Sequence, residues 1–536
     1  MIHNIYTSYI KADRDVNNFF NLKINDFDTA IKNLSEKKSV LSYSHLNEIA
    51  QWNLSLNNSQ LSLQNIEKLK NHDTTAVITG QQTGLLTGPL YTIYKTINCI
   101  QLSKHLSDKY NIPVIPIFWA ASEDHDFDEI KTIHWQTKDN DIKSYQYNPS
   151  EYTSGLSACD IKIEDSIFHL IEEIKTSTID TEFKENVLDI ISKAINTSES
   201  MSDFFARLMV RLFGKYGLVM VSPHLKSIRE LSKPLLIKEI LNPTISSKKI
   251  IETNNELSEI GYTPVLSKNE NQLNMFIYID KIRTKLLFEN NQYQAIDSAG
   301  NVVKNFEKFE LTTLAENNPQ MFSTGVVMRP VVQDYIFPTI AYIGGPGEVS
   351  YFASLKKVYD FFEVSMPIIF PRTSVVLIEP FVKRMIEKSD INIKDLFSSK
   401  GKFKTDLLND TFKKVDLAKD FDEIKKNYIL ELMEFHHNVK EQYPALDAAY
   451  DKFLSYSNQN FSKFEEKLIN EIKNKDDVLK SHGERATNAL FPDNHHQERF
   501  YNIFVPYILK YDFGIIDKLI YSIDPFDYSI QFIEIP

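Results

Sequence analysis

Six of the 15 glycines in this 536-residue chain lie in two short segments, and each segment directly follows an apolar run of strand length. They are Gly80, Gly84 and Gly88 in TGQQTGLLTGP, and Gly344, Gly345 and Gly347 in IGGPGE. Average glycine usage is about 7%, so this chain is expected to place glycine where a positive φ or a close backbone approach requires it. The local geometry of a turn explains either cluster alone, but two clusters with the same flanks indicate a binding site.

A strand, a glycine turn and a helix recur along the chain and predict the fold class. The runs of strand length are TTAVITG (74–80), PVIPIFWA (113–120), GLVMVSP (217–223), PTIAYIGG and MPIIFPR (366–372), with TGVVM as a further strand. Pro89 opens a helix after the first run, since proline suits a first helical turn. Other helices are expected at about 200–214, 330–336 and 347–362. The alternation predicts βαβ units, and therefore an α/β fold with a mostly parallel, doubly wound sheet.

Local changes in composition and in the spacing of apolar residues divide the chain into seven segments. Two stretches with their own alternating or polar runs are interpreted as connecting modules inserted into the core. A glycine-poor stretch rich in Lys, Glu and Asp carries apolar residues at mixed spacings of three and four, which is typical of a long helical coiled-coil arm. The predicted segments are 1–137 (N-terminal helices and first half of the core), 138–200 (first insert), 201–224 (core strand and helix), 225–325 (second insert), 326–375 (second half of the core), 376–487 (arm) and 488–536 (a C-terminal segment that returns to the core).

Composition excludes several classes of partner. Lys+Arg 60 against Asp+Glu 72 gives a net charge of -12, which disfavours nucleic acid as a partner because binding to phosphates depends on Lys and Arg. No apolar stretch of about 18 residues is present, so no membrane span is expected. The first twenty residues lack the apolar region of a signal peptide, which predicts a cytoplasmic protein. Two cysteines cannot form a disulfide scaffold or a thiolate zinc cage.

The first glycine segment stands between a strand and a helix start, where unpaired N–H groups and the helix dipole favour an anion. Its spacing fits neither GxGxxG, because Gln82 replaces a glycine, nor GxxxxGK[ST], because Leu85 and Leu86 replace Gly-Lys. Nucleotide binding and a purely structural loop therefore both stay open. The candidate binding residues here are Gly80, Gln81, Gln82, Thr83, Gly84, Gly88 and Thr92, with Lys95 either reaching back to an anion or lying in solvent.

An acidic cluster, Glu123-Asp124-His125-Asp126, follows the strand 113–120, at the edge where open α/β sheets bind ligands. Its side chains are suited to accept a proton from an attacking amine, to hold a substrate ammonium group or to bind a divalent metal ion. His125 is the predicted base, because its ordinary pKa of about 6.5 is close to neutral pH. A helix start capped by Ser122 explains the same residues without any function.

Further polar residues stand in apolar surroundings in the second half of the predicted core. Arg329 and Arg372 are costly to bury unless paired, so each is either a carboxylate clamp for substrate or a partner in an internal salt bridge to a residue such as Asp334. Glu348 follows GGPG at a helix start, where an acid is favourable on dipole grounds alone. The candidate binding residues of this half are Arg329, Gln333, Asp334, Gly344, Gly345, Gly347, Glu348 and Arg372.

The long helical region suggests two further features. A hairpin would bring its beginning near its end, where two cations and an aromatic face could hold a nucleotide by charge and stacking; the residues are Lys383, Arg384, Leu490 and Phe491. An ordinary solvated helix start is the alternative. The apolar stripe of Phe453, Phe461, Phe464 and Leu468 predicts a homodimer, because an exposed stripe of this kind is unfavourable in a monomer.

Four segments together resemble the cysteine-adding enzymes of bacillithiol synthesis, the BshC family. They are TGQQTGLLTGPLYTIYK, PIFWAASEDHDFDEI, RPVVQDYIFPTIAYIGGPGEVSYFASLK and MPIIFPR, and LFPDNHHQERFYNIF is similar to the C-terminal segment of the family. The matches run from about residue 75 to 505. The resemblance implies a Rossmann-like core with two inserts and a coiled-coil arm that pairs two subunits.

The resemblance also implies a reaction, the ligation of cysteine to glucosaminyl-malate as the last step of bacillithiol synthesis. Formation of this amide at neutral pH requires an activated carboxylate, so a nucleoside triphosphate is expected, with ATP as the first choice. The resemblance assigns no residue roles, and whether a metal ion takes part stays open. The alternative function is a nucleotide-binding dimeric scaffold or sensor, for which the arm alone would be essential.

Overall fold

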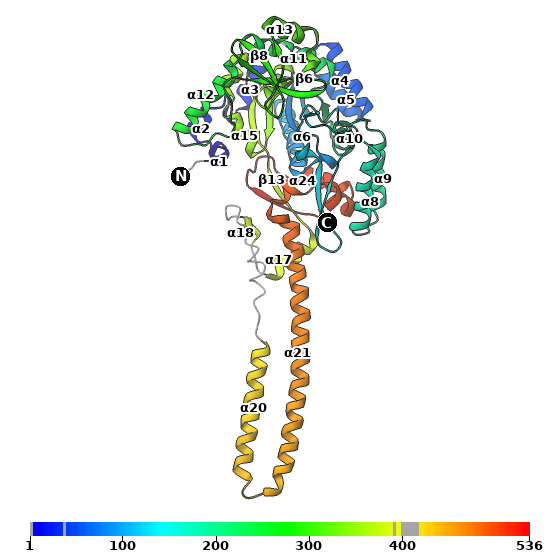
Figure 1. Cartoon of the computed structure of the whole chain (residues 1–536), viewed down its shortest axis with the longest axis vertical. Helices are drawn as coiled ribbons and strands as arrows, with labels where there is room; N and C mark the ends of the chain where they lie inside the picture. Colours follow the sequence, from blue (N-terminus) through cyan, green and yellow to red (C-terminus); the bar gives the residue numbers. More distant parts are fainter. Residues whose placement is uncertain (1–3, 36–38, 390–392, 398–416) are drawn as a thin grey trace. The chain divides into compact units, whose positions relative to one another are not determined.

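The computed structural model describes residues 4–35, 39–389, 393–397 and 417–536, which divide into two compact units. The first unit comprises 1–377 with 496–536, and the second comprises 378–495. Five helices precede the first strand (Figure 1): α1 (Ile5–Ile10), α2 (Arg14–Asn17), α3 (Phe27–Ser35), α4 (Tyr43–Ser55) and α5 (Gln60–Lys68).

The first unit is built on a parallel five-stranded sheet of order β12-β11-β1-β2-β5. Its strands are β1 (Thr75–Gln81), β2 (Val114–Ala120), β5 (Val219–Val221), β11 (Thr339–Gly344) and β12 (Ile368–Pro371). From β1, the sheet extends to β2 and β5 on one side and to β11 and β12 on the other. The order therefore reverses between β1 and β11, as in a doubly wound Rossmann-like sheet. This confirms the predicted fold class.

Helices cover both faces of the sheet, which explains why its strands read as continuous apolar runs. Ala76 and Ile78 of β1 belong to one buried cluster, whereas Val77 between them belongs to another. Such alternation places successive side chains on opposite faces. The core helices are α6 (Leu90–Tyr110), α10 (Met201–Phe213), α14 (Met328–Ile336), α15 (Pro346–Phe352) and α16 (Lys356–Phe362).

Two predictions for the second half of the core are wrong. The TGVVM segment is not a strand of the parallel sheet: β10 (Phe322–Thr324) pairs antiparallel with β6 (Gln272–Ile279), and Val327 precedes the first turn of α14. A short β-branched run cannot by itself distinguish a strand from a helix start. The single helix expected at 347–362 is two helices, because α15 ends at Phe352 and α16 begins at Lys356.

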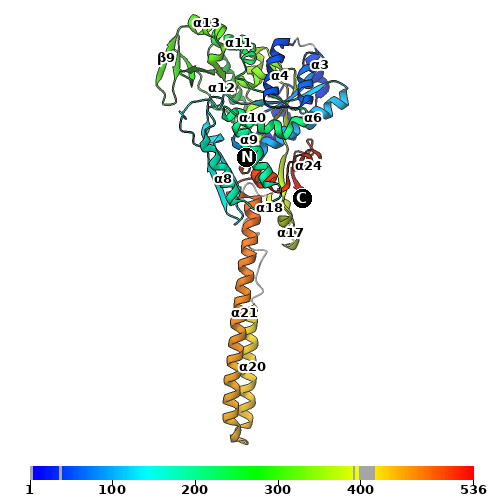
Figure 2. The same ribbon diagram turned by 90° about the vertical axis from the view of Figure 1, so that its right-hand side faces the viewer.

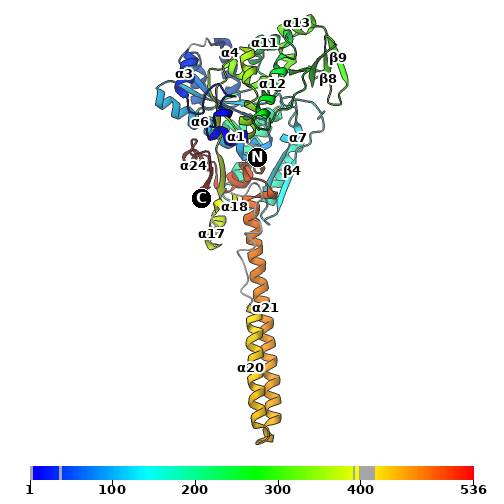
Figure 3. The ribbon, with the colours of Figure 1, turned by 90° about the vertical axis from the view of Figure 1, so that its left-hand side faces the viewer.

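Two groups of elements interrupt the core. The first follows β2 and contains α7 (Phe127–Ile130), β3 (Thr132–Gln136), β4 (Ile142–Gln146), α8 (Phe168–Ser177) and α9 (Lys184–Asn196). The second carries an antiparallel sheet of order β10-β6-β7-β8-β9 (Figure 3) and contains α11 (Lys226–Leu241), α12 (Ile245–Glu259), β6, β7 (Ile282–Glu289), β8 (Gln292–Ile296), β9 (Val302–Phe306), α13 (Lys308–Asn317) and β10.

The C-terminal residues of the chain belong to the same unit as the sheet. They form α22 (Gln497–Phe500), α23 (Leu509–Tyr511), α24 (Gly514–Ser522) and β14 (Ile530–Glu534), and β14 pairs with β13 (Ser374–Ile378). The amide of Gln497 accepts from Leu377 N at 2.8 Å and donates to Leu377 O at 3.1 Å. These bonds tie the segment to the strand that follows the sheet.

The second unit contains α17 (Pro380–Ser389), α18 (Ile393–Phe397), α20 (Leu417–Val439) and α21 (Asp447–Leu490). Helices α20 and α21 lie side by side and antiparallel (Figure 2), because Lys425 pairs with Glu465 at 3.0 Å while His436, farther along, stacks on Tyr450 at 3.8 Å. The predicted arm is thus an antiparallel helical pair, and its residues 390–392 and 398–416 lie outside the described residues.

Candidate active site

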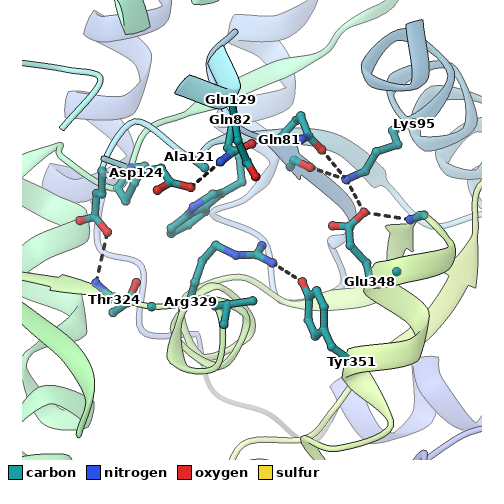
Figure 4. A pocket seen from close by; sticks show the side chains of 18 of the residues that line it. Gln81, Gln82, Lys95, Ala121, Asp124, Glu129, Thr324, Arg329, Glu348 and Tyr351 are labelled. Carbon is teal, nitrogen blue, oxygen red and sulfur yellow. Dashed lines mark hydrogen bonds and ion pairs between the residues drawn. The ribbon is translucent and has the colours of Figure 1, made fainter. Parts of the chain in front are cut away.

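A pocket of about 570 Å³ opens at the carboxyl ends of β1, β2, β11 and β12, where the strand order of the parallel sheet reverses (Figure 4). Ligands of doubly wound α/β proteins bind at this place. Ten of the 25 lining residues have acidic, basic or imidazole side chains: Lys95, Glu123, Asp124, His125, Glu129, Arg283, Arg329, Glu348, Arg372 and Arg499. Both glycine segments contribute to the lining, the first through Gly80 and the second through Gly345 and Gly347.

Lys95 of α6 and Glu348 of α15 form an ion pair of 2.6 Å across the reversal point, in which Lys95 is buried and Glu348 is partly exposed. The Lys95 ammonium also donates to Gly80 O at 2.5 Å and to the Gln81 amide oxygen at 3.2 Å, so all three of its protons have acceptors (Figure 4). Burial raises the pKa of Glu348, but Lys95, Tyr342 and Gly345 N–H outweigh it and hold this pKa below its usual value. Lys95 therefore joins two strand ends and keeps no free proton for an anion.

Arg329 of α14 lines the same pocket without a carboxylate partner among the described residues. Its guanidinium donates to the Tyr351 hydroxyl at 2.7 Å (Figure 4) and also to the Tyr342 hydroxyl at 3.4 Å. Tyrosine hydroxyls fix the plane of the group but do not neutralise it. An enclosed guanidinium with unused N–H donors is a receptor for a carboxylate or phosphate.

Arg372, which follows β12, has a different environment. It forms two hydrogen bonds of 2.6 and 2.8 Å to Glu498 of α22, and both side chains are buried. Arg372 thus forms an internal salt bridge, although it also lines the pocket, whereas Arg329 forms no ion pair with another described residue. The partner of Arg372 is Glu498 rather than Asp334.

The acidic cluster divides between structural and pocket-facing contacts. Glu123 is buried, pairs with Arg229 of α11 and accepts from Thr324 N at 3.3 Å. Asp124 accepts from the Gln82 side chain at 2.8 Å, which links the cluster to the first glycine segment (Figure 4). His125 contacts Arg283 at 2.9 Å. Asp126 precedes α7, is exposed and does not line the pocket.

The first glycine segment contributes its beginning to the pocket and its remainder to a compact loop. Gly80 lies against β2, where a Cβ would stand 2.8 Å from Trp119 O. A Cβ on Gly84 would stand 3.0 Å from the Cα of Gly88, which has a φ of 67°. The N–H of Leu90, the first of α6, donates to Tyr501 O at 2.8 Å and that of Thr92 donates to Pro89 O at 2.9 Å, so two N–H groups of this helix start are satisfied within the protein. The predicted residues Thr83, Gly84, Gly88 and Thr92 are buried and lie outside the pocket lining.

In the second glycine segment, Gly345, Gly347 and Glu348 line the pocket, whereas Gly344 does not. Gln333 and Asp334 of α14 also lie away from it. The buried Asp334 carboxylate accepts from Tyr359 at 2.6 Å and from Gln333 at 3.1 Å. These two residues hold helices together and are not placed to contact a ligand in the pocket.

Gly347 provides a test of the pocket that leaves the fold intact. A Cβ at this position meets no atom within 4 Å, and its φ is not positive. We expect Gly347→Ala to keep or raise the free energy of unfolding, by about 0.4–1 kcal/mol, because alanine restricts the unfolded chain. Gly347→Gln should keep the fold and obstruct the pocket, with at least a tenfold loss of substrate affinity in calorimetric titration. Gly84→Ala is the contrasting variant and should lower the melting temperature; equal binding by Gly347→Gln and wild type would contradict this placement.

The second nucleotide site predicted in the helical region stays a prediction. Leu490 and Phe491 are buried, and the Phe491 ring packs on Phe397 with centroids 4.4 Å apart. Lys383 and Arg384 lie on α17, which contacts α21. Stacking of a base on Phe491 would require this ring to leave its packed position.

Several pocket residues are not among the candidates that the sequence singled out. Phe276 and Arg283 come from β6 and β7 of the second insert, Glu129 from α7, Tyr351 from α15 and Arg499 from α22. Only the alternating pattern of the second insert indicated strands there, and nothing indicated their proximity to the acidic cluster. Within the described parts of the chain, no group of three or more His, Cys, Asp or Glu side chains is arranged to hold a metal ion, and no helix is long and apolar enough to cross a membrane.

The parallel sheet with a charged pocket at its reversal point, together with an antiparallel helical pair, defines a Rossmann-like α/β protein with a coiled-coil region. The family models agree: the N-terminal Rossmann-like domain of BshC, from bacillithiol biosynthesis, matches residues 2–373, and the C-terminal coiled-coil domain of BshC matches 375–535. The chain belongs to the BshC family, and the resemblance noted in the sequence is confirmed.

Curated relatives span nearly the whole chain. A protein of Bacillus cytotoxicus is 30% identical over 532 residues, which cover 97% of this chain and 95% of the relative. A protein of Salinibacter ruber is 30% identical over 499 residues, which cover 92% and 88%. Both bear the name "Putative cysteine ligase BshC".

Proposed function

We propose that this protein is a ligase that joins cysteine to glucosaminyl-malate through an amide bond, with the cysteine carboxylate first activated by a nucleoside triphosphate. The amine of glucosaminyl-malate then displaces the activating group and loses a proton. Membership of the BshC family and the names of the relatives support the class of reaction. ATP is the proposed nucleotide, because a carboxylate and an amine do not condense at neutral pH without activation.

The observation that carries the proposal is the guanidinium of Arg329. It lines a pocket of about 570 Å³, a volume typical of small-molecule sites, and within the described structure only tyrosine hydroxyls accept its hydrogen bonds. The malyl group of glucosaminyl-malate carries carboxylates, which match the fork of N–H donors. We assign Arg329 to this group and keep Gln81, Gln82, Gly345 and Gly347 as further contacts of the bound substrates.

A carboxylate in the same pocket, that of Glu129, is also suited to this reaction. Glu129 is exposed, lines the pocket and makes no ion pair with another described residue. An ammonium group is attracted to such a carboxylate, so Glu129 is suited to hold the amine of a substrate before it reacts. The cationic and acidic sides of the pocket together fit a pair of substrates that carry both carboxylate and amine groups.

The direct test is incubation of the full chain with cysteine, glucosaminyl-malate and each nucleoside triphosphate in turn, with products read by mass spectrometry. We expect a thiol product whose mass is the sum of the two substrates less one water, formed with ATP. The matched control is Arg329→Met, which should form little product. A scaffold or sensor function would instead give nucleotide binding without any new thiol.

We also propose that the helical pair α20–α21 joins two copies of this chain. Part of the predicted stripe is covered within one chain, because Phe461 and Phe464 contact Phe421 with ring centroids 6.0 and 5.0 Å apart. Large apolar side chains nevertheless stay exposed; among them are Ile424 at 61%, Phe435 at 63% and Phe453 at 51%. Solvent exposure of so many apolar side chains favours association.

Sedimentation of the full chain tests the homodimer. Ile424 and Phe435 are eleven positions apart, about three helical turns, and therefore lie on one side of α20. We expect a dimer for wild type and a monomer for the double variant Ile424→Glu, Phe435→Glu, because a charge in an apolar interface is costly. A double variant at charged positions of the same helix, Lys419→Gln and Glu431→Gln, is the control. A monomeric wild type would refute the proposal.

A further inference from the structure

Arg283 connects the second insert to the acidic cluster. Its Nε donates to Ser323 Oγ at 2.9 Å, one terminal nitrogen donates to Thr324 O at 2.7 Å, and the other contacts His125 Nδ1 at 2.9 Å. The guanidinium also lies 3.8 Å from the centroid of the Phe276 ring. Its plane and position are therefore fixed from several directions, and one N–H is directed at His125.

This contact determines the proton on the imidazole. Arginine is always charged and has no acceptor atom, so it must donate to His125 Nδ1. That nitrogen therefore carries no proton, and the neutral ring carries its proton on Nε2. Asp124 Oδ1 lies 3.7 Å from the same Nδ1, too far to hold a proton on it.

We propose that Arg283 is a positioning residue that keeps His125 neutral with its proton on Nε2, so that His125 donates a hydrogen bond to bound substrate instead of accepting a proton from it. His125 lines the pocket, and the acceptor is an oxygen of a carbonyl, carboxylate or phosphate group. The effect on turnover rests on the proposed ligase function, whereas the state of the imidazole does not. The predicted role of His125 as a base is replaced in this proposal by the role of a donor.

Some of the charges around His125 raise its pKa and others lower it. Burial is the largest influence and lowers the pKa of His125 below 6.5, and Arg283 and Lys285 lower it further, whereas Asp124 and Asp126 raise it. A second proton would have to bind at Nδ1, the nitrogen that faces the Arg283 guanidinium. Below the ordinary histidine pKa the unfolded chain accordingly binds this proton more readily than the folded chain.

Nuclear magnetic resonance of the full chain labelled with ¹⁵N in its histidine rings tests the state of His125 without substrate. The His125 signals are identified by their loss in His125→Gln. We expect the Nε2–H tautomer in wild type, with a titration midpoint below 6.5. In Arg283→Gln the midpoint should rise and the Nδ1–H tautomer should appear. The matched control is Lys285→Gln, which removes a nearby charge on the same strand without removing the hydrogen bond and should keep the tautomer.

Either of two spectra would overturn the proposal: an Nδ1–H or doubly protonated His125 in wild type at pH 7, or an unchanged tautomer and midpoint in Arg283→Gln. The wild-type measurement decides even if Arg283→Gln does not fold. Turnover gives a separate result. A donor role predicts that His125→Gln, which keeps an N–H donor, retains at least tenfold more turnover than His125→Ala, whereas a base role predicts equal loss. Failure of the ligase assay itself leaves the spectra as the deciding result and counts only against the proposed function.

Discussion

Replacement of Arg329 by methionine is expected to lower kcat/KM for glucosaminyl-malate by a factor of about 100 or more while the protein stays folded. Removal of one partner from an enclosed charge pair typically costs about 2–5 kcal/mol. The free protein has no such pair to lose, because Arg329 is bonded only to Tyr342 and Tyr351 within the described structure. Unfolding by urea should therefore give a free energy within about 2 kcal/mol of wild type, because two hydrogen bonds to tyrosine hydroxyls are lost but no ion pair is broken.

Arg329→Lys separates the charge of the side chain from its shape. Lysine keeps the positive charge but lacks the planar fork, so an intermediate loss of kcat/KM is expected. Glucosaminyl-malate should raise the melting temperature of wild type and leave that of Arg329→Met unchanged. Wild-type kcat/KM in Arg329→Met would show that the carboxylate binds elsewhere, and a large loss of stability would show that the arginine is structural.

The sheet was predictable from sequence because its strands are buried on both faces. Each strand is a continuous apolar run bounded by a turn signal, so β1, β2, β5, β11 and β12 lie where the runs place them. The TGVVM segment was misassigned because its β-branched residues suit a strand by propensity, while their tertiary context makes them the approach to α14. In such short runs, tertiary packing overrides the β-propensity of the residues.

The site was predictable in location but less so in detail. Residues just after the strands of a parallel sheet converge at one edge whatever their separation in sequence, which brought Gln82, Asp124 and Glu348 to one pocket. The two arginines could not be distinguished, because the partner of Arg372 is 126 positions away and nothing local marks it. The same limit applies to Lys95, whose acid partner is 253 positions away.

The glycine loop shows how one local pattern serves two purposes. A strand, glycines and a helix start are equally consistent with an anion site and with a compact loop. The outcome depends on whether the helix N–H groups stay unpaired, and Tyr501 O, far along the chain, accepts the one from Leu90. Whether this loop binds an anion therefore depends on a long-range contact, which no local sequence pattern reveals.

Replacement of Arg372 by methionine is expected to destabilise the fold strongly, by about 3–5 kcal/mol, because Glu498 would be left as a buried charge without a partner. Urea unfolding at pH 7 measures this loss. The double variant Arg372→Met, Glu498→Met removes both charges and should recover most of it, since apolar side chains of similar size commonly replace a buried pair at little cost. Additive losses in the double variant would show that the two residues do not act as a pair.

The pH dependence of the free energy of unfolding provides an independent test of the Arg372–Glu498 pair. Burial alone would raise the pKa of Glu498, but Arg372 outweighs it and holds this pKa below the ordinary 4.5. A lowered carboxyl pKa contributes stability above its unfolded value and loses it as the pH falls through the folded value. In Arg372→Met the uncompensated Glu498 takes up a proton more readily, so its penalty shrinks in acid. The difference in unfolding free energy between wild type and Arg372→Met should therefore be largest near pH 7. It should narrow as the pH falls from above 4.5, where Glu498 of the variant takes up its proton, to below 4.5, where Glu498 of wild type does. A gap that stays constant in acid would assign the destabilisation to lost packing instead of an unpaired charge.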